Sequence, residues 1–284
     1  MTPILAGSMR DRALAVITTA SALSVVAVFL WLTIDIVIAG GSGLHWDFLF
    51  GNPEDAGRAG GIAPVVVSTL LILGVCMSVC VPVALATAVY LTEYTGTGDV
   101  SSRYVRRILD TLAGVPSVVF GLFGAALFCE ILGLGYSIVS GGLTLACMVL
   151  PFMIRTAEEA LHAIPKRHRL GASALGFSRY GMVTQVLMPI ALPGLSIGLI
   201  MGIGRALAET AALIFTSGYV LRMPESLLDS GRTLSVHIYD LAMNVSGGES
   251  NAYSSALVLV LLLLLINSAT HAITRRFIYK AQHQ

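Results

Sequence analysis

The residues of this chain that could do chemistry include one charge inside an apolar run. Arg205 stands about midway along the apolar residues 192–216. An ionised guanidinium in the middle of a bilayer costs at least ~2.5–3.5 kcal/mol unless it finds a partner or water. Glu209 follows four residues later, one turn along the same face of a helix, so the two side chains are expected to form a hydrogen-bonded pair. The spacing predicts an ion pair inside a membrane span, turned toward protein.

Two interpretations of this pair are open. In one, the two charges only satisfy each other and hold helices together. In the other, which we prefer, Arg205 binds a travelling oxyanion, because a guanidinium is planar, permanently charged and fits two oxygens at once. Glu209 would then hold Arg205 in place when the site is empty, or accept a hydrogen bond from a protonated anion. Thr210, next along the chain, is placed in the same pathway.

The glycine-rich segment 114–124 is a second candidate for the pathway. Pro116 cannot donate a backbone hydrogen bond, while Gly114 and Gly121 permit either close helix packing or an opened turn whose amides face a cavity. Close packing is the favoured interpretation. Ser117 is a candidate to offer its hydroxyl to the anion.

The elements that must position these residues are membrane-spanning helices. Hydrophobic residues make up 56% of the 284 residues and charged residues 12%, which is far too apolar for an ordinary soluble domain. Six apolar stretches reach the roughly 20 residues needed to cross ~30 Å of hydrocarbon. We therefore predict an all-α membrane protein with six transmembrane helices, near residues 13–39, 63–91, 111–132, 136–154, 192–216 and 252–273.

The basic residues predict the side on which each loop lies. Of the 17 Lys and Arg residues, 13 fall in the N-terminal segment, the second-to-third loop, the fourth-to-fifth loop and the C-terminal tail. By the positive-inside rule these segments, and so both termini, are cytoplasmic. The predicted organisation is a cytoplasmic N-terminus over residues 1–12, one transmembrane domain over 13–280 and a cytoplasmic tail over 281–284. No basic stretch interleaved with aromatics suggests nucleic acid, and the His and Cys spacing implies no metal.

The cytoplasmic loop of about residues 156–189 is expected to carry two short helices. The first is expected to start at Thr156 as a cap, with Glu159 three positions later as in a capping box, and to end at a proline. The second is expected to begin near Lys166 and to stop at Gly176. Such a loop is suited to docking another protein.

The second short helix carries a resemblance to a known family. The run G-A-S-A-L-G, followed ten residues after its last glycine by V-L-M-P, resembles the EAA loop of ABC importer permeases, E-A-A-x-x-x-G-x9-I-x-L-P. In that family the loop forms a coupling helix that inserts into a groove of the ATP-binding subunit. This chain has Leu and Gly where the pattern has Glu and its first Ala. The residues assigned to the coupling loop are Leu170, Gly171, Ala172, Leu175, Gly176 and Pro189.

Three further segments resemble the phosphate-specific permeases of this family, the PstA-type subunits more than the PstC-type. They are residues 114–124, 150–161 and 204–212. The resemblance spans about residues 13–280. It implies the type I ABC importer permease (MetI-like) fold, transport of inorganic phosphate across the cytoplasmic (inner) membrane, and a part in transport for the arginine of the R-A-x-x-E-T segment.

The resemblance also implies an assembly in the lipid bilayer. Its other members would be a homologous sister permease (PstC-like), two ATP-binding subunits (PstB-like) and an external phosphate-binding protein (PstS-like). ATP and Mg would be bound by the partner, and no cofactor is expected in this chain. Neither Lys166 nor Lys280 follows a G-x-x-x-x-G that could cradle nucleotide phosphates, so the chain is expected not to be an enzyme.

Two alternatives to phosphate import are kept. A permease for another oxyanion, such as sulfate, molybdate or phosphonate, would use the same guanidinium chemistry. A proton-coupled secondary transporter would show two repeated halves, and none is visible in the sequence. Arg155 and Glu158, at the inward end of the fourth predicted span, are expected to brace the coupling loop.

Overall fold

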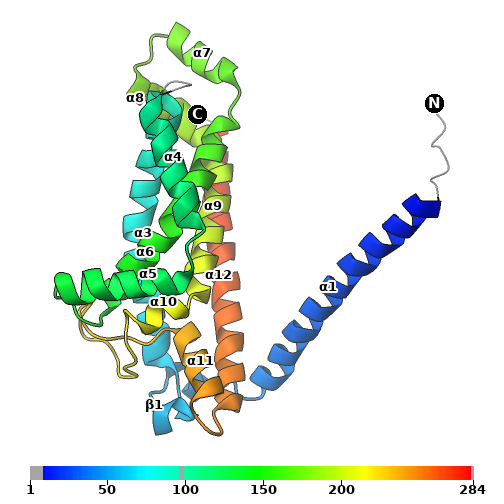
Figure 1. Ribbon diagram of the computed structural model, residues 1–284, viewed down its shortest axis with the longest axis vertical. Coiled ribbons are helices and arrows are strands. Elements are labelled where there is room, and N and C mark those ends of the chain that lie inside the picture. Colours follow the sequence, from blue (N-terminus) through cyan, green and yellow to red (C-terminus); the bar gives the residue numbers. More distant parts are fainter. Residues whose placement is uncertain (1–8, 96–98, 283–284) are drawn as a thin grey trace.

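A computed structural model describes residues 9–95 and 99–282 of the chain. Residues 1–8 and 283–284, which belong to the two predicted cytoplasmic ends, lie outside this part. Long helices dominate the described residues. The bundle is formed by α3 (Ala63–Val89), α6 (Ile138–His162), α9 (Met188–Ala208) and α12 (Glu249–Gln282), which run side by side (Figure 1).

The core of the bundle lies where α3, α6 and α9 meet. Ile72 and Cys76 of α3 pack there with Leu145 and Val149 of α6, all 1% exposed or less. A Cβ on Gly142 would lie 2.6 Å from the Cβ of Val75, so α6 and α3 approach each other at backbone distance. Small residues at such crossings are how helices pack where lipid offers no hydrophobic driving force.

Helix α1 (Met9–Gly41) leaves the bundle and projects away from it (Figure 1). It is attached near its C-terminal end, where Ser254 of α12 donates a hydrogen bond to the carbonyl of Gly40 at 3.2 Å. None of the most apolar part of this helix is buried against the rest of the chain. Its apolar side chains therefore face outward from this subunit.

The connecting elements gather at two opposite ends of the bundle (Figure 1). At one end lie α2 (Trp46–Phe50), the antiparallel strands β1 (Pro53–Glu54) and β2 (Ala59–Gly60) with η1 (Asp55–Gly57) between them, and α11 (Leu234–Met243). At the other end lie α7 (Lys166–Ala174) and α8 (Arg179–Gly181), with η4 (Met182–Leu187) leading into α9. The loops assigned by sequence to opposite sides of the membrane thus occupy opposite ends.

Five helices of the described chain are long and apolar enough to span a membrane, or six if one bent pair counts as a span. The bent pair contains most of the third predicted span, residues 111–132, and begins well before it. It consists of α4 (Val100–Ala113), followed by α5 (Ser117–Gly124) with η3 (Ala125–Ile131), and the chain bends by 102° between the two parts.

The bend corrects the expectation of one continuous third span. Gly114 ends α4, and Pro116 can neither donate an amide nor leave its predecessor free to stay helical, so the helix stops and restarts at Ser117. As a result α5 lies across the bundle rather than along it (Figure 1).

Two other boundaries differ from expectation. The fourth span continues without a break to His162, so Thr156 is inside α6 and caps nothing; its hydroxyl donates to the carbonyl of Phe152 at 2.6 Å. The predicted separate helix from Thr156 does not exist, because the polar residues after Ile154 extend α6 beyond its apolar part. The second span ends in a π-helical turn, η2 (Tyr90–Tyr94).

Candidate functional site

Arg205 lies in the last turn of α9 and its side chain is exposed on the surface of this chain. No ion pair or hydrogen bond joins its guanidinium to another residue within the described ranges. Its neighbours along the helix, Ala206 and Leu207, are buried against the bundle. The guanidinium is therefore held on an apolar helix with its donors directed away from the chain's own core.

The predicted pair between Arg205 and Glu209 is not formed. Helix α9 ends at Ala208, and Glu209 has extended backbone angles (φ −74°, ψ 128°), so the two residues do not share a helical face. Instead the Glu209 carboxylate accepts a hydrogen bond from the amide of Ala212 at 3.2 Å, and the Glu209 carbonyl accepts one from the Ser235 hydroxyl at 2.6 Å. These two hydrogen bonds stabilise the helix break at Glu209, and the carboxylate binds the first turn of the helix that follows.

The helix that follows the break is α10 (Ala211–Ile214), with Thr210 immediately before it. It packs against α5. A Cβ on Gly121 would come within 2.9 Å of the Ala212 Cα and 3.0 Å of the Phe215 ring, so the contact is at backbone distance. Close packing, the favoured interpretation for this segment, therefore holds at Gly121.

The other two residues of the 114–124 segment have different surroundings. Gly114 lies at the bend, where a Cβ would meet no atom nearer than the Thr111 carbonyl oxygen at 3.5 Å. Ser117 is the first residue of α5 and is half-buried. Ser117 begins α5 and Thr210 directly precedes α10, two elements that pack together, and each residue lies at a helix break.

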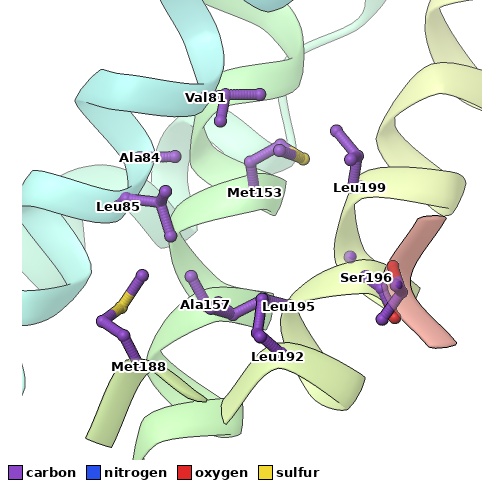
Figure 2. Close-up of a pocket in the computed structure, with 12 residues that line it drawn as sticks. Val81, Ala84, Leu85, Met153, Ala157, Met188, Leu192, Leu195, Ser196 and Leu199 are labelled. Carbon is purple, nitrogen blue, oxygen red and sulfur yellow. The ribbon is translucent and has the colours of Figure 1, made fainter. Parts of the chain in front are cut away.

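A cavity of about 190 Å³ lies between α3, α6, α9 and α12, and Figure 2 shows its walls. Its lining is apolar except for two hydroxyls, Ser196 and Thr274. Both are already used, since Ser196 donates to the Pro193 carbonyl at 2.8 Å and Thr274 to the Thr270 carbonyl at 2.9 Å. An oxyanion would find no charge and no free donor here.

The predicted coupling loop is built as expected at its centre. Helix α7 begins after Pro165 and ends before Gly176, whose φ of +76° is open to glycine at no steric cost. Ala172 is buried, while Leu170 and Leu175 are 70% and 79% exposed. Two large apolar side chains left in the open on a polar loop are typical of a surface that another protein covers. Gly171 has open space around it, and Pro189 is in the first turn of α9.

An ion pair that sequence analysis missed attaches this loop to the bundle. Arg169 of α7 donates to the Glu93 carboxylate of η2 at 2.6 Å, and to the carbonyls of Leu161 and Ile164, both at 2.9 Å. The Glu93 side chain is only 4% exposed. A buried carboxylate needs such a partner, and loss of Arg169 would leave an uncompensated charge.

Arg155 and Glu158 belong to a second charged cluster at the same end. Arg155 donates to the Glu158 carboxylate at 3.0 Å and to the Asp110 carboxylate at 3.1 Å. Arg106 of α4 donates to the other Glu158 oxygen at 2.7 Å and to the carbonyl of Leu91 at 3.2 Å. These groups line a polar cavity of about 720 Å³. They tie α4 to α6 and to η2. The bracing of the coupling loop by Arg155 and Glu158 stays a prediction.

The missed residues had a signal that could have been used. Glu93 and Arg106 flank the second-to-third loop at the ends of apolar stretches, where a charge that enters the protein must find an opposite charge. Nothing in the spacing pairs Arg169 with Glu93, because 76 residues separate them. Within the described residues, no group of three or more His, Cys, Asp or Glu is placed to hold a metal ion.

Comparison with known proteins defines the class. The family described as "Binding-protein-dependent transport system inner membrane component" matches residues 79–280. A probable ABC transporter permease, YqgI of Bacillus subtilis (strain 168), is 31% identical over 249 residues, covering 82% of this chain and 84% of the relative. The phosphate transport system permease protein PstA 1 of Mycobacterium tuberculosis (strain CDC 1551 / Oshkosh) is 34% identical over 213 residues, covering 74% and 69%.

Solved structures share the fold. The crystal structure of a bacterial alginate ABC transporter, in complex with its alginate-bound periplasmic protein, matches with a TM-score of 0.68 at 15% identity, over 95% of this chain and 96% of that one. An inward-facing structure of the MetNI methionine ABC transporter matches with a TM-score of 0.57 at 21% identity, over 76% and 94%.

The chain therefore belongs to the MetI-like family of binding-protein-dependent transport permeases, and it is a multi-pass membrane subunit of an ABC importer. Within this family it is similar to relatives named PstA. The fold class and the family predicted from the sequence are confirmed.

Proposed function

We propose that this chain is a PstA-type permease subunit through which an ATP-driven importer moves inorganic phosphate across the cytoplasmic membrane. The observation that carries the proposal is the exposed guanidinium of Arg205, which no described residue of the chain pairs, near the end of an apolar helix. A fixed cation with free bidentate donors replaces part of the hydration shell that phosphate loses on entering the membrane. The similarity to relatives named as phosphate permeases supports the same substrate.

The pathway in this proposal runs along an outer face of the subunit. The cavity between α3, α6, α9 and α12 is apolar and its hydroxyls are occupied (Figure 2). Arg205 points away from the bundle core, where a homologous sister permease would face it. The anion would then pass between the two permeases, with Arg205 on one wall and Ser117 and Thr210 as neighbouring hydroxyl donors. Glu209, bound to the Ala212 amide, leaves the positive charge of Arg205 available to the anion.

The proposed partners follow from the two ends of the bundle. ATP-binding subunits, which would hold ATP and Mg and carry out hydrolysis, would dock on α7 through Leu170 and Leu175 at the cytoplasmic end. An external phosphate-binding protein would dock at the end that carries β1, β2 and α11, and both termini would be cytoplasmic. The alginate transporter was solved with its periplasmic protein bound, which supports an assembly of this type.

The remaining question is which oxyanion is carried, because a guanidinium also suits sulfate, molybdate and phosphonate. The test is uptake of labelled phosphate by cells that depend on the complete transporter, with unlabelled phosphate, sulfate or molybdate added in tenfold steps. Phosphate import predicts that only unlabelled phosphate competes at low concentration. Equal competition by sulfate or molybdate would identify a different substrate, and uptake driven by a proton gradient without ATP would indicate a secondary transporter.

A further inference from the structure

The coupling helix and Arg205 lie in different parts of the fold, and the described contacts join them through α4, α5 and α10. The first link is the Arg169–Glu93 ion pair, which fastens α7 to η2. Because Glu93 is buried and Arg169 also binds two carbonyls at the end of α6, α7 cannot shift without moving η2 or breaking this pair.

The second link is Arg106 on α4. One of its nitrogens donates to the Leu91 carbonyl in η2 and another to the Glu158 carboxylate in α6. Leu91 and Glu93 belong to the same π-helical turn. Arg106 of α4 binds this turn at Leu91, and Arg169 of α7 binds it at Glu93. Arg106 thus connects α4 directly to the turn that α7 holds.

The third link is the bend between α4 and α5. Only Gly114, Val115 and Pro116 separate the two helices, and the chain bends by 102° there. A bend that short converts a tilt of α4 into a sideways movement of α5. Arg155 holds α4 rigid, because it donates to the Arg106 carbonyl at 3.1 Å and binds Asp110 one turn later on the same helix.

The last link is the contact between α5 and α10 at Gly121 and Ala212, where the backbones touch. The Ala212 amide is the group that the Glu209 carboxylate binds, and Glu209 ends the helix that carries Arg205. A direct route from α7 along α9 is expected to transmit displacement less effectively, because a π-helical turn precedes α9 and Pro193 interrupts its hydrogen bonds.

We propose that Arg106 is a positioning residue that transmits displacement of α7 through α4 and α5 to the helix break beside Arg205. The proposal deepens the proposed function and rests on it for the role of Arg205. Arg106 suits this role because its side chain, on α4, binds both η2 and α6, and because Arg155 would still bind the Glu158 carboxylate if Arg106 were replaced.

The test uses the complete transporter in proteoliposomes, with a spin label on Val118→Cys, an exposed position of α5, in a background whose four native cysteines are replaced. Its spectrum is recorded without nucleotide and after trapping with ADP and vanadate, and ATP hydrolysis is measured on the same samples. We expect trapping to shift the spectrum in the parent protein. In Arg106→Gln the shift should disappear while hydrolysis remains. Arg107→Gln, the same change at the adjacent exposed arginine, should keep the shift.

Further variants separate transmission from folding. Arg106→Lys keeps the charge but cannot hold both the Leu91 carbonyl and Glu158, so it should lose most of the shift. Glu158→Gln should also weaken it, and combining this change with Arg106→Gln should add little. The proposal would be overturned if trapping did not change the label's spectrum in the parent protein, or if Arg106→Gln showed the full spectral shift. A parent complex that shows the shift but imports no phosphate would defeat the substrate assignment alone.

Discussion

The carboxylate of Glu209 lies 3.2 Å from the amide nitrogen of Ala212, where it caps a new helix instead of neutralising Arg205. The Arg205 guanidinium is therefore exposed and has no ion-pair partner among the described residues. The same contact fixes the start of α10, the element on which α5 rests. One carboxylate thus shapes the helix break and leaves the cation next to it unpaired among the described residues.

The cap at Glu209 can be tested by two substitutions. Glu209→Gln retains an oxygen that can accept from the Ala212 amide, so its unfolding midpoint should stay close to that of the parent complex. Glu209→Ala removes the acceptor and should lower the free energy of unfolding by about 0.5–2 kcal/mol. Thermal unfolding of the purified complex measures both. Equal destabilisation by the two variants would show that the negative charge, rather than the cap, is what matters.

The helix break at Glu209 also shows the limit of what the sequence could predict. The apolar periodicity of residues 192–216 is that of one span, whereas the extended backbone at Glu209 is stabilised by the local bond to the Ala212 amide and by the distant bond from Ser235, which the periodicity does not show. Arg205 and Glu209 are four residues apart, which would pair them on one helix, but α9 ends at Ala208 and the predicted pair is not formed. By contrast, the bend at Gly114–Pro116 follows from local chemistry, and the proline could have been used to predict it.

The backbone contact between α5 and α10 predicts a difference between two glycines of one segment. In Gly121→Ala the new methyl would lie 2.9 Å from the Ala212 Cα, so one of the helices must shift. We expect a loss of about 1–3 kcal/mol in the free energy of unfolding. Gly114→Ala is the matched control, because its methyl meets nothing closer than 3.5 Å. Thermal midpoints of both variants should differ clearly, and equal midpoints would refute the packing.

The end of the bundle that carries α11 should make a pH-sensitive contribution to stability through His237. This side chain is fully buried, and neither ring nitrogen has a partner in the described chain. Burial, with help from the nearby Arg232 charge and against the effect of Asp240, lowers the pKa of His237 to about 4. The unfolded chain, with a pKa near 6.5, then binds more protons between these values, so stability falls as pH drops through this window.

The size of this effect is on the order of 3 kcal/mol when the pH falls from above 6.5 to about 4. The check is the unfolding midpoint of the purified complex at a series of pH values, for the parent and for His237→Leu. The variant should lose part of the parent's sensitivity to acid between pH 6.5 and 4. Identical pH profiles would mean that the ring is hydrated or paired in the native protein.

The coupling loop predicts a loss of assembly without a loss of fold. Leu175 is 79% exposed, so Leu175→Ser should leave the unfolding of this subunit unchanged while it weakens co-purification with the ATP-binding subunit several-fold. Leu228→Ser, at an exposed leucine of the opposite end, is the control. Retention of the ATP-binding subunit by Leu175→Ser would place the docking surface elsewhere.

The coupling loop also illustrates what sequence patterns can give. The exposed leucines and the glycine stop of α7 were predictable, because they depend on a short local motif. The Arg169–Glu93 pair and the Arg106–Glu158 pair join residues 76 and 52 positions apart, so only the folded bundle brings them together. Short sequence patterns therefore predicted the helices of this loop, whereas the ion pairs of Arg169 and Arg106 became visible only in the folded structure.

The most direct test of the account is phosphate flux through the complete transporter carrying Arg205→Gln. Assembly is checked by co-purification, and Arg107→Gln serves as a control for the loss of one exposed positive charge. The account predicts that Arg205→Gln assembles normally yet imports almost no labelled phosphate in proteoliposomes supplied with ATP, while the control imports at the parent rate. Import at the parent rate by Arg205→Gln would contradict the central claim that this guanidinium meets the anion in the membrane.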